Sequence, residues 1–323
     1  MSAASFDVAA LRQLLPEPIV GPVTSVTPIH MGLSGAGVFA VTGARGEYIL
    51  RVQGERADDL SWTQQLRVLR RAAEHGIAPA ILHVDEGARA VISVRVGVPL
   101  PAALADPAQR APAIAAVVER VRALHAIDPS GVEERDAVDF ARGAWEAQRG
   151  RAGFPGWAAG IGAALDAIAA VLARDPRRVV SHNDLNPGNV LWDGARAWLV
   201  DWEVAGLAHP YYDLAAFVTF LALDTEAANG LLALQERAPL DDGARATFAA
   251  LRQLVALVAG CIFLGLVPNL AVLTAPTRAD APTLLACYAE MRAGKLDLQA
   301  PRGRAAVGLA LLRIGTEPTQ PSV

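Results

Sequence analysis

The fold is decided by Ser181–Val190, which reads SHNDLNPGNV, and by Leu199–Glu203, which reads LVDWE. In the first stretch, Asp184 precedes Asn189 by five residues among residues that favour loops. In the second stretch, Asp201 ends an apolar run twelve residues after Asn189. A carboxylate, an amide and a second carboxylate therefore follow one another at short intervals, each beside a short apolar segment typical of a strand.

The spacing D-x-x-x-x-N is typical of a kinase catalytic loop, in which the Asp handles the acceptor hydroxyl and the Asn holds a metal ion. An ionised Asp184 can accept the hydrogen bond of a substrate hydroxyl and orient it. Asn189 and Asp201 offer the hard oxygen ligands that Mg²⁺ prefers. Glu203 points the same way as Asp201 if the strand continues, and there it either binds metal through water or faces solvent. The pattern predicts phosphoryl transfer.

The competing interpretation is an ordinary turn, because Asn, Asp, Pro and Gly all favour loops. Turn chemistry does not require the observed order of His182, Asp184, Asn189 and Asp201 between apolar strands. We interpret His182 as structural support for the loop and not as a proton donor. Asp213, in HPYYDLA, is expected to cap or brace the helix that follows.

Composition places the chain among globular proteins with large cores. It has 323 residues, of which 53% are hydrophobic and 19% charged, so two lobes are possible and wholesale disorder is not expected. A net charge of −4 with no concentrated basic face argues against nucleic acid as a partner. Cys261 and Cys287 lack metal-ligand spacing and are expected to be buried free thiols.

No membrane insertion is expected from the sequence. The apolar run Leu254–Val267 is too short to span a bilayer before Pro268 breaks it, so we interpret it as a buried helix. The N-terminus lacks a basic region followed by an apolar core, so no secretory signal is expected. We therefore expect a cytoplasmic protein.

The first 95 residues predict a compact β-rich unit. A helix is expected from Asp58–Asp59 to about His75, with Gly76 as its C-cap. The five expected strands are rich in β-branched residues: Val23–Ile29, Val38–Val41, Tyr48–Val52, Ala80–Val84 and Ala90–Val94. Arg95–Pro101, RVGVPLP, is expected to be extended and not helical because of its prolines.

The first connection, Met31–Gly37, reads MGLSGAG. Its glycines Gly32, Gly35 and Gly37, with Ser34, would let the backbone approach an anion and point N–H groups at it. A plain hairpin connection is the alternative, and it is the commoner use of such a sequence.

From residue 102 the chain is expected to be mainly helical. Asp106 is a predicted N-cap with Pro107 at the first helical position, and Asp128–Gly156 gives no clear pattern. Short strands are expected at Val179–Ser181, Val190–Trp192 and Ala197–Val200. The expected helices run from Pro107 to about Ile127 and over Gly160–Ala173, Tyr211–Leu223, Thr225–Glu236, Asp242–Leu266, Ala279–Ala293 and Arg302–Ile314.

With these residues in place, the chain resembles the aminoglycoside phosphotransferase and choline/ethanolamine kinase family, closest to the choline kinase branch. The resemblance rests on HNDLNPGNVLWDG followed by LVDWEVAGLAHPYYDLA. It implies an α+β, protein-kinase-like fold of two lobes, one small, β-rich and with one main helix, the other larger and mostly helical. The implied domains are a nucleotide-binding N-lobe at 1–95, a linker at 96–101, and a C-lobe at 102–323 with the catalytic loop, metal site and acceptor site.

The resemblance also implies a role for each motif residue. Asp184 would be the catalytic base, and Asn189 and Asp201 the Mg²⁺ ligands, with Glu203 as a secondary acidic residue. ATP would lie under the Met31–Gly37 loop, with Ser34 near its terminal phosphate. The backbone of Val94–Gly97, including Val94 and Val96, would contact adenine.

The sequence departs from the family at the phosphate-binding pair. Arg51 stands where kinases of this superfamily usually have a lysine that pairs with the α- and β-phosphates. Arginine can still bind phosphate, through a fork of donors. The position of its glutamate partner is occupied by Gln65, a neutral amide that cannot form the ion pair. This departure motivates a second hypothesis, a nucleotide-binding module with little catalysis.

The acceptor is expected to be a small, amine-bearing molecule with a hydroxyl group. Choline or ethanolamine is the first choice. The alternative is an aminoglycoside or another small molecule with a hydroxyl group, and a neutral sugar stays open. Aromatic rings can cage a quaternary ammonium, and exposed carboxylates can attract a protonated amine. The candidate acceptor residues are Trp202, Tyr211, Tyr212, Asp224 and Glu226.

Overall fold

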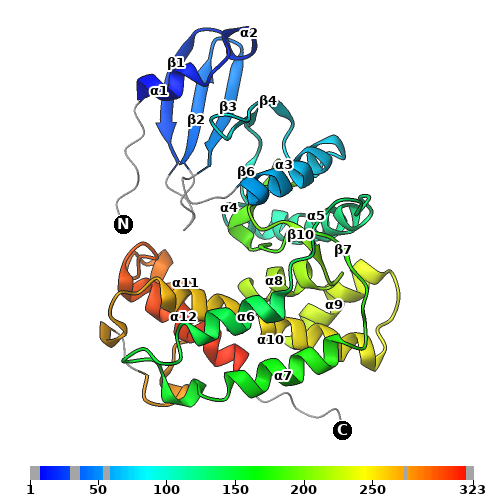
Figure 1. Ribbon diagram of the computed structural model, residues 1–323, viewed down its shortest axis with the longest axis vertical. Helices are drawn as coiled ribbons and strands as arrows, with labels where there is room; N and C mark the ends of the chain where they lie inside the picture. The colour runs from blue at the N-terminus through cyan, green and yellow to red at the C-terminus, as the bar shows by residue number, and fades with distance from the viewer. Residues whose placement is uncertain (1–7, 30–36, 54–58, 273–274, 318–323) are drawn as a thin grey trace. The chain divides into compact units, whose positions relative to one another are not determined.

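The computed structural model describes residues 8–29, 37–53, 59–272 and 275–317 (Figure 1). The chain divides into two compact units. The first unit is Met1–Glu133 with Pro187–Gly206, and the second is Glu134–Asn186 with Leu207–Val323. The first unit therefore holds the predicted N-lobe and, in addition, the segment that carries Asn189 and Asp201.

A five-stranded antiparallel sheet forms the β-rich part of the first unit, in the order β1-β2-β3-β5-β4. Alternate residues of its strands, among them Phe39, Val41, Leu50 and Ile92, are buried in one core. The predicted strands are confirmed, as β1 (Val23–Pro28), β2 (Gly37–Gly43), β3 (Gly46–Val52), β4 (Ile81–Asp85) and β5 (Ala90–Val94). Two short helices that we did not expect, α1 (Val8–Gln13) and α2 (Glu17–Val20), precede the sheet.

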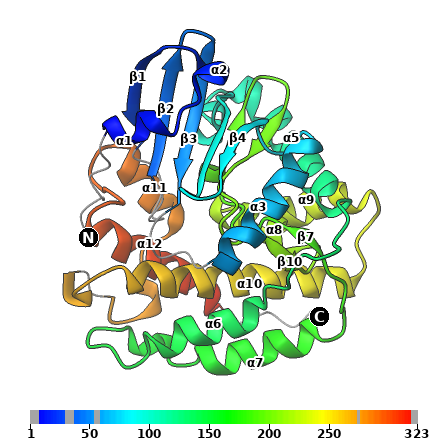
Figure 2. The same cartoon turned by 45° about the horizontal axis from the view of Figure 1, so that its top comes forward.

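Helix α3 (Asp59–Glu74) connects β3 to β4 and lies beside the sheet (Figure 2). Its buried residues include Leu66 and Leu69 at helical spacing, which form its apolar face. Gly76 follows with φ of 65°, the left-handed conformation expected of a C-cap glycine. The predicted helix is thus confirmed over its described residues.

The segment after the sheet corrects one expectation. RVGVPLP was expected to be extended throughout, yet α4 (Leu100–Leu104) begins inside it, after the two-residue strand β6 (Val98–Pro99). Pro101 stands in the first turn of α4, where a missing backbone N–H costs nothing. Gly97 has φ of +50°, and a Cβ there would lie 2.5 Å from the Trp192 carbonyl oxygen. The close approach of β6 to β8 therefore requires glycine.

The remainder of the first unit places the metal-site segment. Helix α5 (Pro107–His125) is capped as predicted, because Asp106 accepts the Ala108 N–H at 2.9 Å. Strands β8 (Val190–Trp192) and β9 (Ala197–Leu199) form a hairpin that pairs with β6. The Leu199 N–H donates to the Ile77 carbonyl at 2.9 Å, which ties this hairpin to the end of α3.

The second unit is mainly helical (Figure 1). Strand β7 (Val179–Ser181) pairs with β10 (Gly206–Ala208), which we did not predict, just before the HPYYD sequence. The helices are α6 (Ala137–Glu146), α7 (Ile161–Leu172), α8 (Tyr212–Phe220), α9 (Thr225–Glu236), α10 (Asp242–Gly265), α11 (Leu284–Arg292) and α12 (Pro301–Gly315).

Two of these helices differ from expectation. Helix α6 lies in a region where no pattern was clear, and its start is fixed by Asp136, which accepts the N–H groups of Val138 and Asp139. Helix α11 was expected to begin at Ala279 but begins at Leu284, after a separate 3₁₀ turn at Arg278–Asp280. Pro282 follows that turn and prevents a continuous helix.

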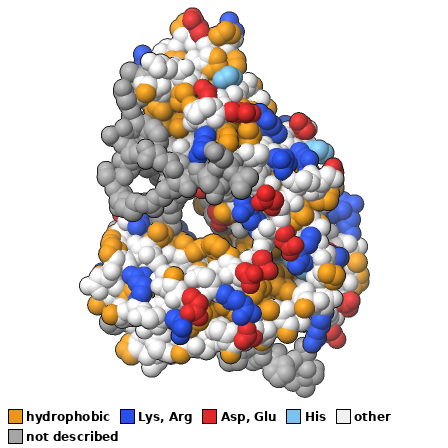
Figure 3. Space-filling model, in the orientation of Figure 1, with side chains coloured by type: hydrophobic (Ala, Val, Ile, Leu, Met, Phe, Trp, Pro, Cys, Tyr) orange, Lys and Arg blue, Asp and Glu red, His pale blue; other side chains and the backbone are white. Residues whose placement is uncertain are grey.

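Helix α10 is the central helix of the second unit. We expected its apolar run to be too short to span a bilayer, which is wrong, because the helix has 24 residues and is long and apolar enough. The expected burial agrees with the structure, since 61% of its most apolar window is buried within the protein, as in a core helix. Gly260 lets α12 approach closely, since a Cβ there would lie 2.7 Å from the Leu312 side chain. Cys261 and Cys287 are buried free thiols, as predicted. On the face shown in Figure 3, acidic and basic side chains are interspersed.

Candidate active site

The predicted catalytic loop leaves β7 in the second unit, and a buried carboxylate anchors it. Asp213 is fully buried in the first turn of α8. Its two oxygens accept the backbone N–H groups of His182, at 2.9 Å, and Asn183, at 2.8 Å. Hydrogen bonds to a carboxylate are stronger than those between neutral groups, so Asp213 fixes the backbone immediately before Asp184. We expected Asp213 to cap or brace α8, whereas these two hydrogen bonds brace the predicted catalytic loop.

The loop backbone is unusual at Asn183, which has φ of 65°. Asn is one of the few non-glycine residues that adopt this left-handed conformation readily. This left-handed residue lies between the end of β7 and Asp184. Asn186 then donates from its side chain to Asp184 Oδ1 at 3.2 Å, which orients one face of the carboxylate.

Tyr212 shares the electrostatic environment of this loop. Its side chain is 8% exposed. Burial raises the pKa of the Tyr212 hydroxyl well above its usual range, and the charges of Asp184 and Asp213 raise it further. The phenol therefore stays protonated over the physiological range and can only act there as a neutral donor or acceptor.

The first unit brings together the predicted phosphate-binding residue Arg51 and two of the predicted metal-site residues, Asp201 and Glu203. Arg51, on β3, places Nη2 2.8 Å from Asp201 Oδ1 and 2.5 Å from Glu203 Oε1. All three side chains are partly buried, at 17%, 23% and 26% exposure. Asp201 has φ of 70°, which turns the chain after the strand so that both carboxylates converge on one cation.

The contacts of Asp201 and Glu203 with one cation bear on whether these residues suit Mg²⁺. The Arg51 guanidinium stands in the position of a positive charge held by two hard oxygen donors, and Mg²⁺ takes one or two carboxylates of this kind together with substrate phosphates. Asn189 is anchored at the start of β8, since its carbonyl accepts the Val200 N–H at 3.0 Å. Within the described residues, no group of three His, Cys, Asp or Glu side chains forms a closed metal cage. The carboxylate oxygens of Asp201 and Glu203 are of the kind that fits Mg²⁺.

The expected nucleotide-binding residues lie on the sheet of the first unit. Gly37 starts β2 opposite Val52 of β3, while Gly32, Ser34 and Gly35 lie outside the described residues. The Val94 N–H donates to the Ala80 carbonyl at 3.0 Å, so it is used within the sheet. Val96 follows as part of the irregular connection to β6. Gln65 is 2% exposed on α3, where the glutamate partner of a lysine was expected.

The candidate acceptor residues fall into two kinds. Trp202 is 2% exposed and donates its indole N–H to the Leu199 carbonyl at 3.1 Å, so it packs within its own unit. Tyr211 is buried edge-on between His209 and Phe248. Asp224 and Glu226 are exposed at the start of α9, and Asp224 also caps that helix through the Ala227 N–H.

Sequence reasoning missed a polar network just before α8, in which the buried His209 contacts more exposed charged side chains. His209 is 5% exposed and contacts Asp175 through Nε2 at 3.1 Å. Arg177 donates to the same carboxylate from Nε, at 2.9 Å, and from Nη2, at 2.6 Å. Its guanidinium also lies over the Tyr211 ring, 5.3 Å from the ring centroid. The only available signal was the HP pair preceding YYD, because Asp175 lies 34 residues upstream of His209.

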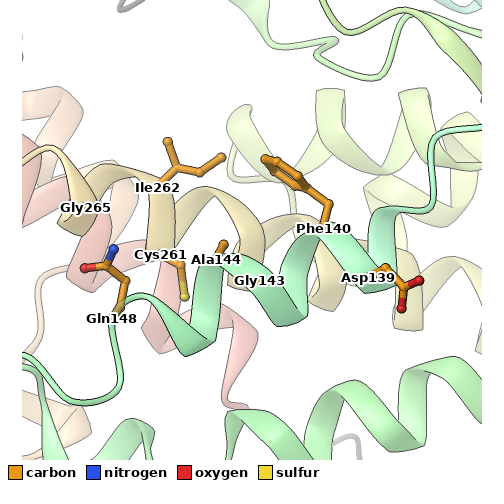
Figure 4. Close-up of a pocket in the computed structure, with 8 residues that line it drawn as sticks. All are labelled: Asp139, Phe140, Gly143, Ala144, Gln148, Cys261, Ile262 and Gly265. Atoms are coloured by element: carbon orange, nitrogen blue, oxygen red, sulfur yellow. The ribbon is translucent and has the colours of Figure 1, made fainter.

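A pocket of about 450 Å³ lies between α6 and α10 in the second unit. Figure 4 shows Phe140 and Ile262 projecting from the two helices toward the same side, with Cys261 between the helices. None of the residues singled out for chemistry lines it. The residues that line it are Asp139, Phe140, Gly143, Ala144, Gln148, Cys261, Ile262 and Gly265.

A family model described as "Phosphotransferase enzyme family" matches residues 25–253. This range includes Arg51, the predicted catalytic loop, Asp201 and Asp213. The chain belongs to this family. The match covers most of the chain and confirms the resemblance predicted from the two motifs.

Comparison with individual proteins agrees with this assignment. The chain is 43% identical over 51 residues to "Protein LicA" of Haemophilus influenzae, a match that covers 16% of this chain and 19% of that protein. A choline/ethanolamine kinase family protein from Mesorhizobium loti is similar in structure, with a TM-score of 0.67 and 18% identity over 93% of this chain and 98% of that one.

Two further structures show the same fold. LicA in complex with AMP has a TM-score of 0.59 and 16% identity, covering 94% of this chain and 96% of that one. Aminoglycoside-3'-phosphotransferase of type VIII has a TM-score of 0.57 and 24% identity, covering 76% and 97%. At these identities the likeness shows the fold, which is the predicted kinase-like α+β fold.

Proposed function

We propose that this member of the phosphotransferase family is an ATP- and Mg²⁺-dependent kinase acting on a hydroxyl group of a small, amine-bearing molecule in the cytoplasm. One observation carries the proposal: Asp201 and Glu203 converge on the Arg51 guanidinium at 2.8 and 2.5 Å. Two carboxylates directed at one cation are what a nucleotide-bound metal needs. A turn sequence without chemistry has no reason to produce this arrangement.

The roles of the residues follow from their chemistry. Asp184 would accept the hydrogen bond of the acceptor hydroxyl and align its oxygen, which is most of what phosphoryl transfer asks of a protein. Asn189 and Asp201, with Glu203, would hold Mg²⁺, which neutralises phosphate charge when bound. Arg51 would then exchange its carboxylate partners for phosphate oxygens, which suit its planar fork.

For nucleotide recognition we propose the sheet of the first unit. Arg51 is central in it, paired with Val38 on one side and Val91 on the other. Because the Val94 N–H already bonds to Ala80, a backbone donor for adenine would come from Val96 or Gly97. The AMP complex of the structurally similar LicA supports adenine nucleotide as the ligand class.

The acceptor that we favour is an amino alcohol of the choline or ethanolamine kind. Its support is the fold shared with a choline/ethanolamine kinase family protein. An aminoglycoside is the second candidate, favoured by the exposed carboxylates of Asp224 and Glu226, which could attract protonated amines. The burial of Trp202 and Tyr211 weakens the case for these two rings as parts of an aromatic cage.

ADP release in the presence of Mg²⁺ tests the proposal with a panel of amino alcohols and aminoglycosides. We expect turnover with one acceptor class and its loss in Asp184→Asn, with ATP binding retained. The matched control is Asp242→Asn, since the Asp242 side chain is 94% exposed at the start of α10. Absence of both turnover and nucleotide binding would contradict the proposal.

A nucleotide-binding module with little catalysis is the alternative, motivated by Gln65 and by the engagement of Arg51 with the two carboxylates. It predicts that ATP raises the melting temperature equally in the wild type and in Asp184→Asn, and that neither protein turns over any acceptor. Turnover lost only in the variant rules this alternative out.

A further inference from the structure

The start of α8 is held by a histidine that must be neutral. The backbone N–H of Tyr211 donates to His209 Nδ1 at 3.1 Å. Because a backbone N–H is always the donor, Nδ1 has no proton, and the single ring hydrogen is on Nε2. That hydrogen points to Asp175 Oδ2 at 3.1 Å, so one tautomer satisfies both contacts.

The same segment leads directly to the anchor of the catalytic loop. Tyr211 is followed by Tyr212 and then by Asp213, whose carboxylate accepts the N–H groups of His182 and Asn183. The Tyr212 N–H donates to the His209 carbonyl at 2.9 Å, which closes a turn between the two residues. On the other side, Gln235 of α9 donates to the Pro210 carbonyl at 2.9 Å. A shift of His209 would therefore displace Asp213 through the short backbone segment that joins the two residues.

We infer that His209 is a positioning residue for the catalytic loop, and that its protonation releases the loop. A second hydrogen, on Nδ1, would face the Tyr211 N–H, and two donors cannot bond to each other. The start of α8 would move, and the Asp213 carboxylate would no longer match the two loop N–H groups. Asp184, the next residue of the loop, would lose its alignment with an acceptor hydroxyl.

The charged groups around His209 determine when this happens. Asp175 favours the protonated ring, while Arg177 and Arg178 oppose it. Burial opposes it most strongly and lowers the pKa of His209 below its usual value. Arg177 also occupies both oxygens of Asp175, which keeps that carboxylate fixed toward the ring. The ring is thus neutral at neutral pH and becomes charged in acid.

Amide hydrogen exchange tests the inference without requiring turnover. The His209 ring state is followed by its ¹⁵N chemical shifts, and exchange protection is measured for the His182 and Asn183 amides from neutral pH downward. In the wild type we expect protection of these two amides to fall about fivefold or more as His209 protonates, the loss of roughly one buried hydrogen bond. Protection that does not follow His209 protonation would overturn the inference.

Two variants separate positioning from simple packing. His209→Asn keeps an acceptor near the position of Nδ1 but cannot be protonated. Exchange protection of the two amides should therefore stay high and should not change over the pH range in which His209 titrates in the wild type. His209→Leu removes the acceptor, so protection should be low at every pH while the protein stays folded by circular dichroism. If protection in His209→Asn falls with pH exactly as in the wild type, the inference is wrong. His75→Asn, at an exposed histidine on α3's end, is the control and should match the wild type.

The kinetic part of the test rests on the proposed kinase function. With an acceptor in hand, kcat of the wild type should fall in acid with one proton bound, while the KM for ATP changes less than about twofold. His209→Asn should lack this acidic limb. If kcat of His209→Asn falls in acid as it does in the wild type, the result counts against the inference. Failure to find any acceptor counts against the proposed function instead, and the hydrogen-exchange result then decides the role of His209.

Discussion

Arg51 Nη2 lies 2.8 Å from Asp201 Oδ1, although the two residues are 150 positions apart in the chain. The same nitrogen reaches Glu203, so one cation holds two predicted metal ligands. The Arg51 guanidinium supplies the positive charge that balances these two carboxylates. Under the proposed function, Mg²⁺ would take over the two carboxylates, and Arg51 would turn to the phosphate oxygens of the nucleotide.

Removing Arg51 should destabilise the protein in a way that Mg²⁺ can reverse. In Arg51→Ala the partly buried carboxylates of Asp201 and Glu203 repel each other, and we expect a loss of about 1–3 kcal/mol in the free energy of unfolding. Thermal melts in chelator and in millimolar Mg²⁺ measure the effect. The melting temperature of the variant should rise with Mg²⁺ more than that of the wild type.

A matched control is Arg70→Ala, which removes an exposed ion pair with Glu86 at 3.2 Å. Exposed pairs contribute about 0–1 kcal/mol, so this variant should melt close to the wild type and respond to Mg²⁺ in the same way. Equal melting shifts and equal Mg²⁺ responses in the two variants would contradict the assigned role of Arg51.

Asp213→Asn should impair catalysis without weakening nucleotide binding. An amide has only one acceptor oxygen, so one of the N–H groups of His182 and Asn183 would face an NH₂ group instead. We expect a loss of about 1–3 kcal/mol in stability and a fall in kcat of about a hundredfold, because small displacements of catalytic groups are costly. Unfolding in urea and steady-state kinetics with the identified acceptor measure the two effects. A normal kcat in a folded variant would refute the loop-anchoring role.

Local patterns in the sequence predicted the elements that surround the site. The five strands, the Asp106 cap and the order of Asp184, Asn189 and Asp201 are each encoded within a few neighbouring residues. Helix α6 was not predicted, since it lies in a stretch without clear periodicity, even though Asp136 is a good capping residue. Pro101 misled the prediction in the opposite direction, because proline is excluded from helix interiors but not from first turns.

Contacts between distant residues could not be predicted. The pairing of Arg51 with Asp201 depends on how β3 and the segment after β9 meet, and nothing near either residue encodes it. The contact between His209 and Asp175 is likewise not encoded near either residue. The burial of Gln65 on α3 could not be predicted from its neighbours either. Charged and amide side chains favour solvent unless a partner is present, so their burial becomes evident only with the fold.

The stability of the protein should fall on acidification, partly because of His209. Burial lowers the pKa of His209, so the unfolded chain binds a proton below pH about 6.5 while the folded chain does not. Folding is therefore penalised as pH falls below about 6.5, until the folded pKa is reached. Urea unfolding at pH 8 and pH 5.5 measures this loss. His209→Asn, which cannot titrate, should lose less stability over this interval than the wild type.

Asp175 acts in the same direction at lower pH. The hydrogen bonds from Arg177 hold the pKa of the Asp175 carboxyl well below its usual range. The contribution of Asp175 to the free energy of unfolding is fully present above the pKa of about 3.9 that its carboxyl has in the unfolded chain. This contribution is lost as the pH falls through the lower pKa of the folded chain. Asp175→Asn should thus differ from the wild type in stability mainly above pH about 4. A constant difference down to pH 2 would contradict this assignment.

The two thiols should report unfolding. Burial raises the pKa of Cys261 to about 12 and that of Cys287 to about 11, and both side chains are at most 2% exposed. Since only the thiolate reacts, maleimide labelling at pH 8 should require opening of the helices. Labelling rates followed by mass spectrometry should rise together with urea concentration. Rapid labelling of either cysteine in the native protein would disprove its burial.

Gly97→Ala should be among the most damaging of the conservative substitutions. The new Cβ would lie 2.5 Å from the Trp192 carbonyl oxygen, and φ of +50° disfavours any side chain. Separating β6 from β8 to relieve this clash should cost about 2–4 kcal/mol in unfolding free energy. The control is Gly143→Ala within α6, where a Cβ meets nothing within 4 Å and should add up to about 1 kcal/mol through helix propensity. Opposite shifts in urea midpoint are expected for the two variants, and a neutral Gly97→Ala would mean that β6 does not approach β8 as described.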